Sequence, residues 1–329
     1  MMARRKCAIV GCGNVGSCIA YTLITVYAGL FEEIILIDIN KKRAMAEAED
    51  ISHSLPFYAQ AKIYCGDYED ISDAMVVVIA AGAAQRPGED RRSLLTRNIP
   101  IFRDIMESIG KYNDHCTVIV VSNPVDILTY TALYLSGRDR KHVLGTGCVL
   151  DTARLKYELG TRIGVDTRNI HMFILGEHGD TEVPIWSGAN ISGINLDDYC
   201  ASFEGACPNE PFESIFENVR DSAYRIIEGK GATYYGIAGA ACRIISAIVR
   251  GENTIMPVSV YLQGEYDING VCLSVPCVVG SGGIKRIIEI PLSAEEKERL
   301  LISAKAMEAL IEAAGLSEAK LAFKDDLFA

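Results

Sequence analysis

The first half of the chain alternates short apolar runs with longer amphipathic stretches. The runs, rich in β-branched residues, cover residues 8–10, 33–37, 75–80 and 117–121. Uninterrupted apolar runs of this length are typical of parallel strands that are buried on both faces. The stretches at residues 41–53 and 94–112 are predicted helices. This alternation predicts an α/β fold built on a doubly wound parallel sheet.

The pattern changes after residue 145. We expect a helix over 150–159, a strand over 171–175, a long helix after Ile215, and antiparallel strands over 258–262, 271–279 and 283–290. Residues 293–296, SAEE, match a capping box and begin a helix that we expect to serve structure only. The sequence therefore predicts a doubly wound domain over residues 1–145 and an α+β domain over residues 146–329.

Charge and cysteine content restrict the partners and the compartment. The 329 residues carry a formal net charge of −11, so no overall positive field favours nucleic acid, and we expect no such partner. The 11 cysteines are odd in number and form neither a C-x-x-C pair nor a zinc-like spacing with histidine. This usage predicts reduced thiols, no metal site and a cytoplasmic protein.

Residues 7–31 contain no charged side chain and so resemble a signal peptide or a membrane span. Glycines and an asparagine interrupt the stretch, which divides into a strand over 7–10, a glycine turn and a helix from Val15. Export would also expose the cysteines to mispairing. We therefore expect neither a signal peptide nor a membrane span.

The glycine turn reads GCGNVG at residues 11–16. A lone G-x-G-x-x-G is a weak indication, but this one follows a strand, opens a helix and precedes Asp38 at the end of the second strand. Glycines let backbone N–H groups approach a pyrophosphate at the helix N-terminus. The Asp38 carboxylate suits both ribose hydroxyls and would repel a 2′-phosphate. The segment favours NAD binding over a turn without function.

GEHGD at residues 176–180 directly follows a predicted strand. A single histidine is by default a surface or core residue, but flanking glycines admit substrate and cofactor, and imidazole titrates near neutrality. Asp151 and Arg154, three residues apart on a predicted helix, share one face. They form either a solvated ion pair, which spacing alone favours, or a group in which Asp151 orients His178 and Arg154 binds a carboxylate.

Two polar segments end neighbouring strands, at residues 82–92, GAAQRPGEDRR, and at Asn123. Ligands bind α/β sheets in the crevice at the carboxyl ends of the strands. Residues 82–92 are therefore either a mobile surface loop or a lid over a ligand.

Six motifs occur together in the chain: GCGNVGS, GAAQRPGEDRR, VSNPVDILTY, VLDTARLKYELG, GEHGDTEVPIWS and KGATYYGIA. By these motifs the chain resembles the L-lactate/malate dehydrogenase family, most closely its bacterial lactate members, over residues 6–310. The resemblance implies an NAD-binding Rossmann domain followed by an α+β catalytic domain. It also implies reversible hydride transfer between NADH and pyruvate, giving L-lactate.

The same resemblance implies a role for each matching residue. His178 would donate and accept the proton with Asp151 as its partner, and Arg91 would polarise the substrate carbonyl. Arg154 would bind the substrate carboxylate. Gln85, Asn123 and Thr233 would line the substrate site. The residues that would bind NAD are Gly11, Gly13, Asn14, Val15, Gly16, Asp38 and Asn123.

Gln85 indicates the substrate. Family members that reduce oxaloacetate carry arginine at this position, because a second carboxylate needs a second cation. A neutral Gln85 leaves that carboxylate without a charge partner, which favours pyruvate, although Arg86 lies one residue along. Malate dehydrogenase, or another L-2-hydroxy acid dehydrogenase, is the alternative. A non-catalytic NAD-sensing module is the alternative from another class, and it has no use for His178, Asp151 and Arg154 together.

Regulation and assembly are also implied by the resemblance. Members activated by fructose 1,6-bisphosphate use an arginine and a histidine at an intersubunit site, and Lys156 and His171 correspond to them. Lysine keeps the charge but loses the bidentate geometry, so weakened activation and no activation both stay open. The family resemblance implies a homotetramer, with a dimer as the alternative.

Overall fold

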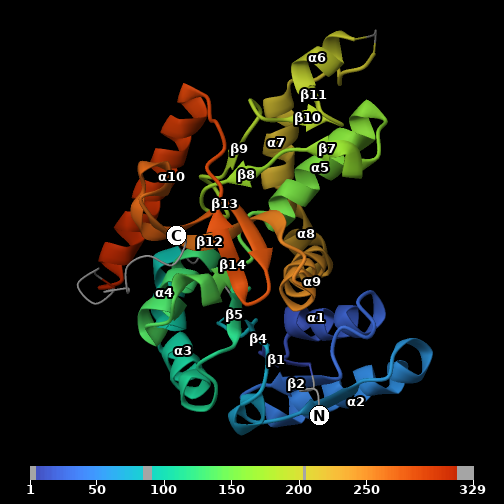
Figure 1. The fold of residues 1–329 in the computed structure, drawn as a ribbon, viewed down its shortest axis with the longest axis vertical. Coiled ribbons are helices and arrows are strands. Elements are labelled where there is room, and N and C mark those ends of the chain that lie inside the picture. Colours follow the sequence, from blue (N-terminus) through green and yellow to red (C-terminus); the bar gives the residue numbers. More distant parts are fainter. Residues whose placement is uncertain (1–4, 84–90, 203–204, 317–329) are drawn as a thin grey trace.

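The computed structural model describes residues 5–83, 91–202 and 205–316, without the side chains of Arg91 and Arg92. A nine-stranded sheet runs through the molecule in the order β14-β13-β12-β6-β5-β4-β1-β2-β3 (Figure 1). Its parallel strands are β1 (Lys6–Val10), β2 (Glu33–Ile37), β3 (Lys62–Cys65), β4 (Val76–Ile79), β5 (Thr117–Val120) and β6 (Val143–Gly145). The order β3-β2-β1-β4-β5-β6 is that of a Rossmann sheet, which confirms the predicted fold class.

Helices cover both faces of the parallel strands. They are α1 (Asn14–Thr25), α2 (Lys41–Tyr58), α3 (Arg91–Tyr112) and α4 (Val125–Ser136). Helices α1 and α2 contact each other, as do α3 and α4, and Figure 1 shows the two pairs on opposite sides of the sheet. Double coverage explains why the parallel strands are continuous apolar runs: both faces of each strand lie in the core.

The antiparallel strands of the second half extend the same sheet. They are β12 (Thr254–Gln263), β13 (Asn269–Gly280) and β14 (Gly283–Ile287), which ends short of the predicted residue 290. Strand β12 joins the parallel part by pairing Ser259 with Gly145 of β6. The largest buried cluster includes Ile9, Leu273 and Leu300, and so it continues across the predicted boundary at residue 145.

The remaining elements of the second half are α5 (Val149–Ile163), β7 (Ile170–His171), β8 (Ile174–Leu175), β9 (Val183–Pro184), β10 (Asn190–Ile191), β11 (Ile194–Asn195), α6 (Leu196–Ala201), α7 (Phe212–Arg220), α8 (Ser222–Lys230), α9 (Tyr235–Arg250) and α10 (Ala294–Ala313). Helices α9 and α10 pack into the large cluster, and a second, smaller cluster lies around α5 and α7. Buried residues of α5, β7 and α7, among them Leu159, Ile170 and Phe216, form this cluster. The predicted capping box is present, because Ser293 and Glu296 exchange both hydrogen bonds.

Several sequence predictions were wrong in detail. The long helix expected after Ile215 is three helices, because Asp221 separates α7 from α8 and Gly231, with φ +85°, ends α8. The strand expected over residues 171–175 is two short strands that pair with different partners. Cys200 and Cys207, expected to be free thiols, are disulfide-bonded with Cα atoms 4.9 Å apart, a proximity that their separation along the chain did not indicate.

The uncharged stretch near the N-terminus is strand β1, the glycine turn and helix α1, as predicted. Among the described residues, no helix has both the length and the apolar character needed to cross a membrane.

Candidate active site

His178 lies in a tight turn that directly follows β8. Gly176 and Gly179 flank this turn with φ of +91° and +145°, values that favour glycine. The imidazole Nδ1 lies 2.5 Å from Asp151 Oδ2, and Arg154 Nη1 donates to Asp151 Oδ1 at 3.1 Å. Asp151 is 3% exposed, so the solvated ion pair that spacing alone favoured is wrong. Helix α5 holds both side chains against the histidine.

Electrostatics in this group favour a charged imidazole. Burial alone would lower the pKa of His178, but the charges and hydrogen bond of Asp151, with further help from Glu182 and Asp126, raise it to about 9. Burial likewise opposes the charge on Asp151, and His178 and Arg154 nevertheless hold its pKa below the usual 3.8. These charges and the hydrogen bond therefore favour the protonated imidazole in the free protein.

Asp126 completes the surroundings of His178 and was not singled out from the sequence. Its Oδ2 accepts the backbone N–H of His178 at 2.7 Å, and the residue is 2% exposed in the first turn of α4. Burial raises the pKa of Asp126 to about 6. The available sequence signal was a lone acidic residue within the otherwise apolar run VDILTYTALYL. A carboxylate is buried in such a run only where a hydrogen-bonding partner offsets the free energy lost on leaving water.

A cavity of about 220 Å³ opens beside this group at the carboxyl ends of the parallel strands. It brings together five of the predicted site residues: Val15, Asn123, Arg154, His178 and Thr233. Its other lining residues are Ala80, Val121, Ser122, Thr146, Leu150, Ala223, Ile227 and Ile237. A guanidinium and an imidazole thus share a cavity lined by both polar and apolar side chains, an arrangement suited to a small molecule that carries a carboxylate.

The glycine turn forms a cradle that fits a dinucleotide. A Cβ on Gly16 would lie 1.9 Å from the Gly11 carbonyl oxygen, and a Cβ on Gly11 would lie 2.4 Å from the Ala81 nitrogen. Because both distances are too short for any side chain, packing requires glycine at both positions. Among the described residues, nothing lies within 4 Å of a Cβ on Gly13, which leaves the N-terminus of α1 open to a pyrophosphate there. Asn14 begins that helix.

Asp38 closes the other side of the cradle. One carboxylate oxygen accepts the Cys12 N–H at 2.7 Å, and the other accepts the Asn40 N–H at 2.8 Å. These bonds fix the carboxylate beside the turn, with lone pairs remaining for ribose hydroxyls.

Two predicted residues are not placed by the structure. Gln85 lies outside the described residues, and so does Arg86. Arg91 is the first residue of α3, which follows that segment, but its side chain is not described. The roles expected for Gln85 and Arg91 stay predictions.

Lys156 and His171 lie together in a second depression, of about 370 Å³, whose lining includes two further cations, Arg168 and Arg243. Burial lowers the pKa of Lys156. Within the described part of the chain, no carboxylate forms an ion pair with Lys156, whereas Arg168 pairs with Asp166 and Arg243 pairs with Glu252. The role expected for Lys156 and His171 stays a prediction.

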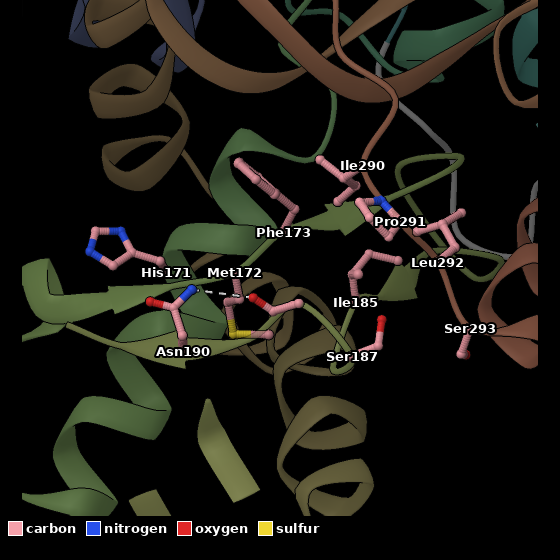
Figure 2. Close-up of a pocket in the computed structure, with 11 residues that line it drawn as sticks. His171, Met172, Phe173, Ile185, Ser187, Asn190, Ile290, Pro291, Leu292 and Ser293 are labelled. Atoms are coloured by element: carbon pink, nitrogen blue, oxygen red, sulfur yellow. Dashed lines mark hydrogen bonds between the residues drawn. The ribbon is translucent and has the colours of Figure 1, made fainter. Parts of the chain in front are cut away.

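Another cavity, of about 540 Å³, shares His171 with that depression, and His171 is the one predicted site residue in its lining. Figure 2 shows Phe173, Ile185 and the segment Ile290, Pro291 and Leu292 gathered around it. Its apolar lining lacks the convergent polar groups of a catalytic centre.

One cluster in the described chain has the composition of a metal site. Cys148, Asp151 and Glu182 place ligand atoms within 4.8 Å of one another. Both oxygens of Asp151 are already bound by His178 and Arg154, so the cluster belongs to the proton-transfer group and we assign it no metal.

Comparisons with known proteins find relatives along nearly the whole chain. A family model for the NAD binding domain of lactate/malate dehydrogenase matches residues 5–145, and one for the alpha/beta C-terminal domain of that family matches residues 148–316. An L-lactate dehydrogenase of Acetivibrio thermocellus is 47% identical over 94% of this chain and 96% of its own. L-lactate dehydrogenase 1 of Clostridium acetobutylicum is 44% identical over 94% and 98%.

Solved structures give the same result. A lactate dehydrogenase from a Medee basin deep-sea metagenome library superimposes with a TM-score of 0.91 at 40% identity, covering 95% of this chain and all of its own. The minor L-lactate dehydrogenase of Enterococcus mundtii gives 0.90 at 36% identity, over 94% and 98%.

A Rossmann sheet with a dinucleotide cradle, beside a His–Asp–Arg group centred on a buried aspartate, defines a protein of the NAD-dependent dehydrogenase class. Within that class, the chain belongs to the lactate/malate dehydrogenase family.

Proposed function

We propose that this chain is an NAD-dependent L-lactate dehydrogenase, which interconverts pyruvate and L-lactate. The observation that carries the proposal is the group formed by His178, Asp151 and Arg154 at the wall of the cavity that Val15 and Asn123 also line. It places a proton donor and a carboxylate-binding cation side by side, next to the cofactor cradle. A non-catalytic NAD-binding module has no need for such a group.

In the proposed reaction, each residue of this group has a separate role. Arg154 binds the pyruvate carboxylate through charge-assisted hydrogen bonds, which orients the ketone toward His178. His178 donates its proton from Nε2 to the carbonyl oxygen, and Asp151 stabilises the imidazolium until then. NADH, when bound, supplies the hydride that adds to the ketone carbon. In the reverse direction, neutral His178 takes the hydroxyl proton of lactate.

The other predicted residues complete this proposal. We assign Arg91 to the polarisation of the carbonyl, and Asn123 and Thr233 to the walls of the cavity. Gly11, Gly13, Asn14, Val15 and Gly16 hold the pyrophosphate at the start of α1, and Asp38 binds the ribose. We accordingly assign NAD binding to residues 1–145 and catalysis to residues 146–329, since Asp151, Arg154, His178 and Thr233 all follow residue 145.

Substrate choice rests on Gln85. A buried second carboxylate beside a neutral amide lacks a charge partner, which costs several kcal/mol before relaxation, so we propose pyruvate over oxaloacetate. The test is NADH oxidation with each substrate, by the protein and by Gln85→Arg. We expect a strong preference for pyruvate that Gln85→Arg shifts at least tenfold toward oxaloacetate. A preference for oxaloacetate in the unmodified protein would instead mean malate dehydrogenase.

We further propose that the cationic depression around Lys156 and His171 binds fructose 1,6-bisphosphate in a homotetramer. The half-buried Lys156 ammonium, which has no ion pair among the described residues, supports this proposal, and the ion-paired Arg168 and Arg243 line the same depression. Lys156→Arg, which restores bidentate geometry, should lower the effector concentration that gives half-maximal activation, and Lys156→Ala should abolish activation. Sedimentation in parallel measures the assembly, and a response that is equal in both variants would rule out this site.

We place the protein in the cytoplasm. Nine of its cysteines are free, and seven of these are buried, a set of thiols that an oxidising compartment would put at risk of mispairing.

A further inference from the structure

We infer that Ser303 of the C-terminal helix α10 is a positioning residue, which holds the turn carrying His178 in register with Asp151. The inference rests on the proposed proton transfer by His178. It concerns a residue 125 positions from that histidine in the chain, on a helix whose sequence indicated a structural role only.

The Ser303 side chain is buried and makes two contacts with the turn. Its Oγ accepts the backbone N–H of Glu177, the residue before His178, at 2.7 Å, and lies 3.0 Å from Thr181 Oγ1. Thr181 Oγ1 in turn donates to Glu177 Oε2 at 2.5 Å. Because the Thr181 proton is used in that bond, the Ser303 proton is directed at Thr181. One hydroxyl thus connects both sides of His178.

The approach of α10 to the turn is as close as a backbone without a side chain allows. A Cβ on Gly176 would lie 2.9 Å from Ser303 Oγ, so the glycine is required at this contact. Gly176 also exchanges two backbone hydrogen bonds of 2.9 Å with Ser274 of β13. The turn is therefore fixed to the sheet at its start and to α10 immediately afterwards.

Helix α10 fixes the following segment as well. Glu296 accepts the Ser187 N–H at 2.9 Å and the Ser187 hydroxyl at 2.5 Å. The strand between these attachments, β9, also contacts α10. Two attachments seven residues apart on one helix, at Glu296 and Ser303, define the path of the chain from residue 177 to residue 187.

This path determines where the imidazole lies. Three buried acidic side chains outside the turn influence the charge of His178: Asp126 of α4, Asp151 of α5 and Glu182, which precedes β9. The 2.5 Å contact with Asp151 is sensitive to small shifts, because charge-assisted hydrogen bonds weaken steeply with distance and angle. A turn released from Ser303 would loosen that contact, and misplacement by about 1 Å can cost a large factor in rate.

The test compares Ser303→Ala with Leu300→Ala on the same helix. Alanine keeps α10 helical but leaves the Glu177 N–H without its acceptor, whereas Leu300, 1% exposed, lies in the core without contacting the turn through a hydrogen bond. We expect Ser303→Ala to lower kcat for pyruvate about tenfold, with NADH Kd within about twofold of the unmodified protein. In its pH profile of kcat/KM for pyruvate, the alkaline limb should move from about pH 9 toward pH 6.5, because a weaker contact with Asp151 raises the pKa of His178 less. Leu300→Ala should lower Tm without moving the limb.

A second pair of variants keeps the inference testable if Ser303→Ala does not fold. Thr181→Val removes the hydroxyl that faces Ser303, so it should lower kcat as Ser303→Ala does. Thr181→Ser keeps the hydroxyl, so it should retain the activity of the unmodified protein. An unshifted limb and unchanged kcat in Ser303→Ala, or an equal shift in Leu300→Ala, would overturn the inference. Failure of the unmodified protein to reduce pyruvate would instead overturn the proposed function.

Discussion

At the scale of single residues, the proposed chemistry depends on a proton held by the partly exposed His178. His178→Asn removes the proton donor but keeps a polar side chain of similar size, so we expect kcat to fall by a factor of about 10² to 10⁴. The binding of NADH, measured by fluorescence titration, should be unchanged because the cradle is untouched. The matched control is His115→Asn, since the His115 side chain is 93% exposed. Equal losses in both variants would show that His178 has no special role.

The sequence identified only some of the residues that contact the His178 turn. His178 was singled out by its flanking glycines, whereas the spacing of Asp151 and Arg154 alone favoured a solvated ion pair, and their roles came from the family resemblance. Asp126 and Ser303 were not singled out, since each acts through a contact with a backbone N–H that is distant in the chain. Such contacts exist only after α4 and α10 have packed around the turn. The sequence pattern of neither helix records them.

At the scale of elements, a substitution in the glycine turn can weaken cofactor binding while leaving the fold intact. Gly13→Ala places a methyl group in open space, so the fold should persist, yet that space is where a pyrophosphate approaches α1. We expect Tm to stay within a few degrees while NADH Kd rises at least about tenfold. Gly110→Ala is the control, because its methyl group also meets nothing within 4 Å and lies on α3, away from the cradle. A Gly13→Ala variant with unchanged Kd would contradict this position for the cofactor.

The predicted elements were correct where a single local cause fixes them. Strands β1, β2, β4 and β5 were found from apolar runs, and α10 from its capping box. Strand β3 and the three-residue β6 were missed, because β3 is only partly buried and β6 is short. The separation of α7 from α8 at Asp221 is set by packing, since α7 buries Ile215, Phe216 and Val219 while α8 buries none of its residues.

At the scale of the whole molecule, one sheet and one large core join the two predicted halves. The sequence indicated the antiparallel strands but not that β12 would continue the parallel sheet beyond β6, because edge pairing depends on the final arrangement of layers. The cavity that we propose as the active site lies where these parts meet, with Val15 and Asn123 from one half and Arg154 and Thr233 from the other. We therefore expect NADH and the inhibitor oxamate, a carboxylate analogue of pyruvate, to raise Tm together by more than the sum of their separate effects, measured by calorimetry. Strictly additive shifts would contradict a shared site.

The most direct test of the account is the pH dependence of kcat/KM for pyruvate in the unmodified protein and in Asp151→Asn. This parameter reports the free enzyme, in which His178 must carry its proton. We predict an alkaline limb near pH 9, because the pKa of His178 is raised to about that value, so activity is full at neutral pH and is lost as the pH rises through the limb. Asp151→Asn removes the charge that opposes the effect of burial, and the limb should move well below 9 with a large loss of kcat/KM. A limb at the same pH in both proteins would contradict the claim that the His178–Asp151 pair supplies the proton.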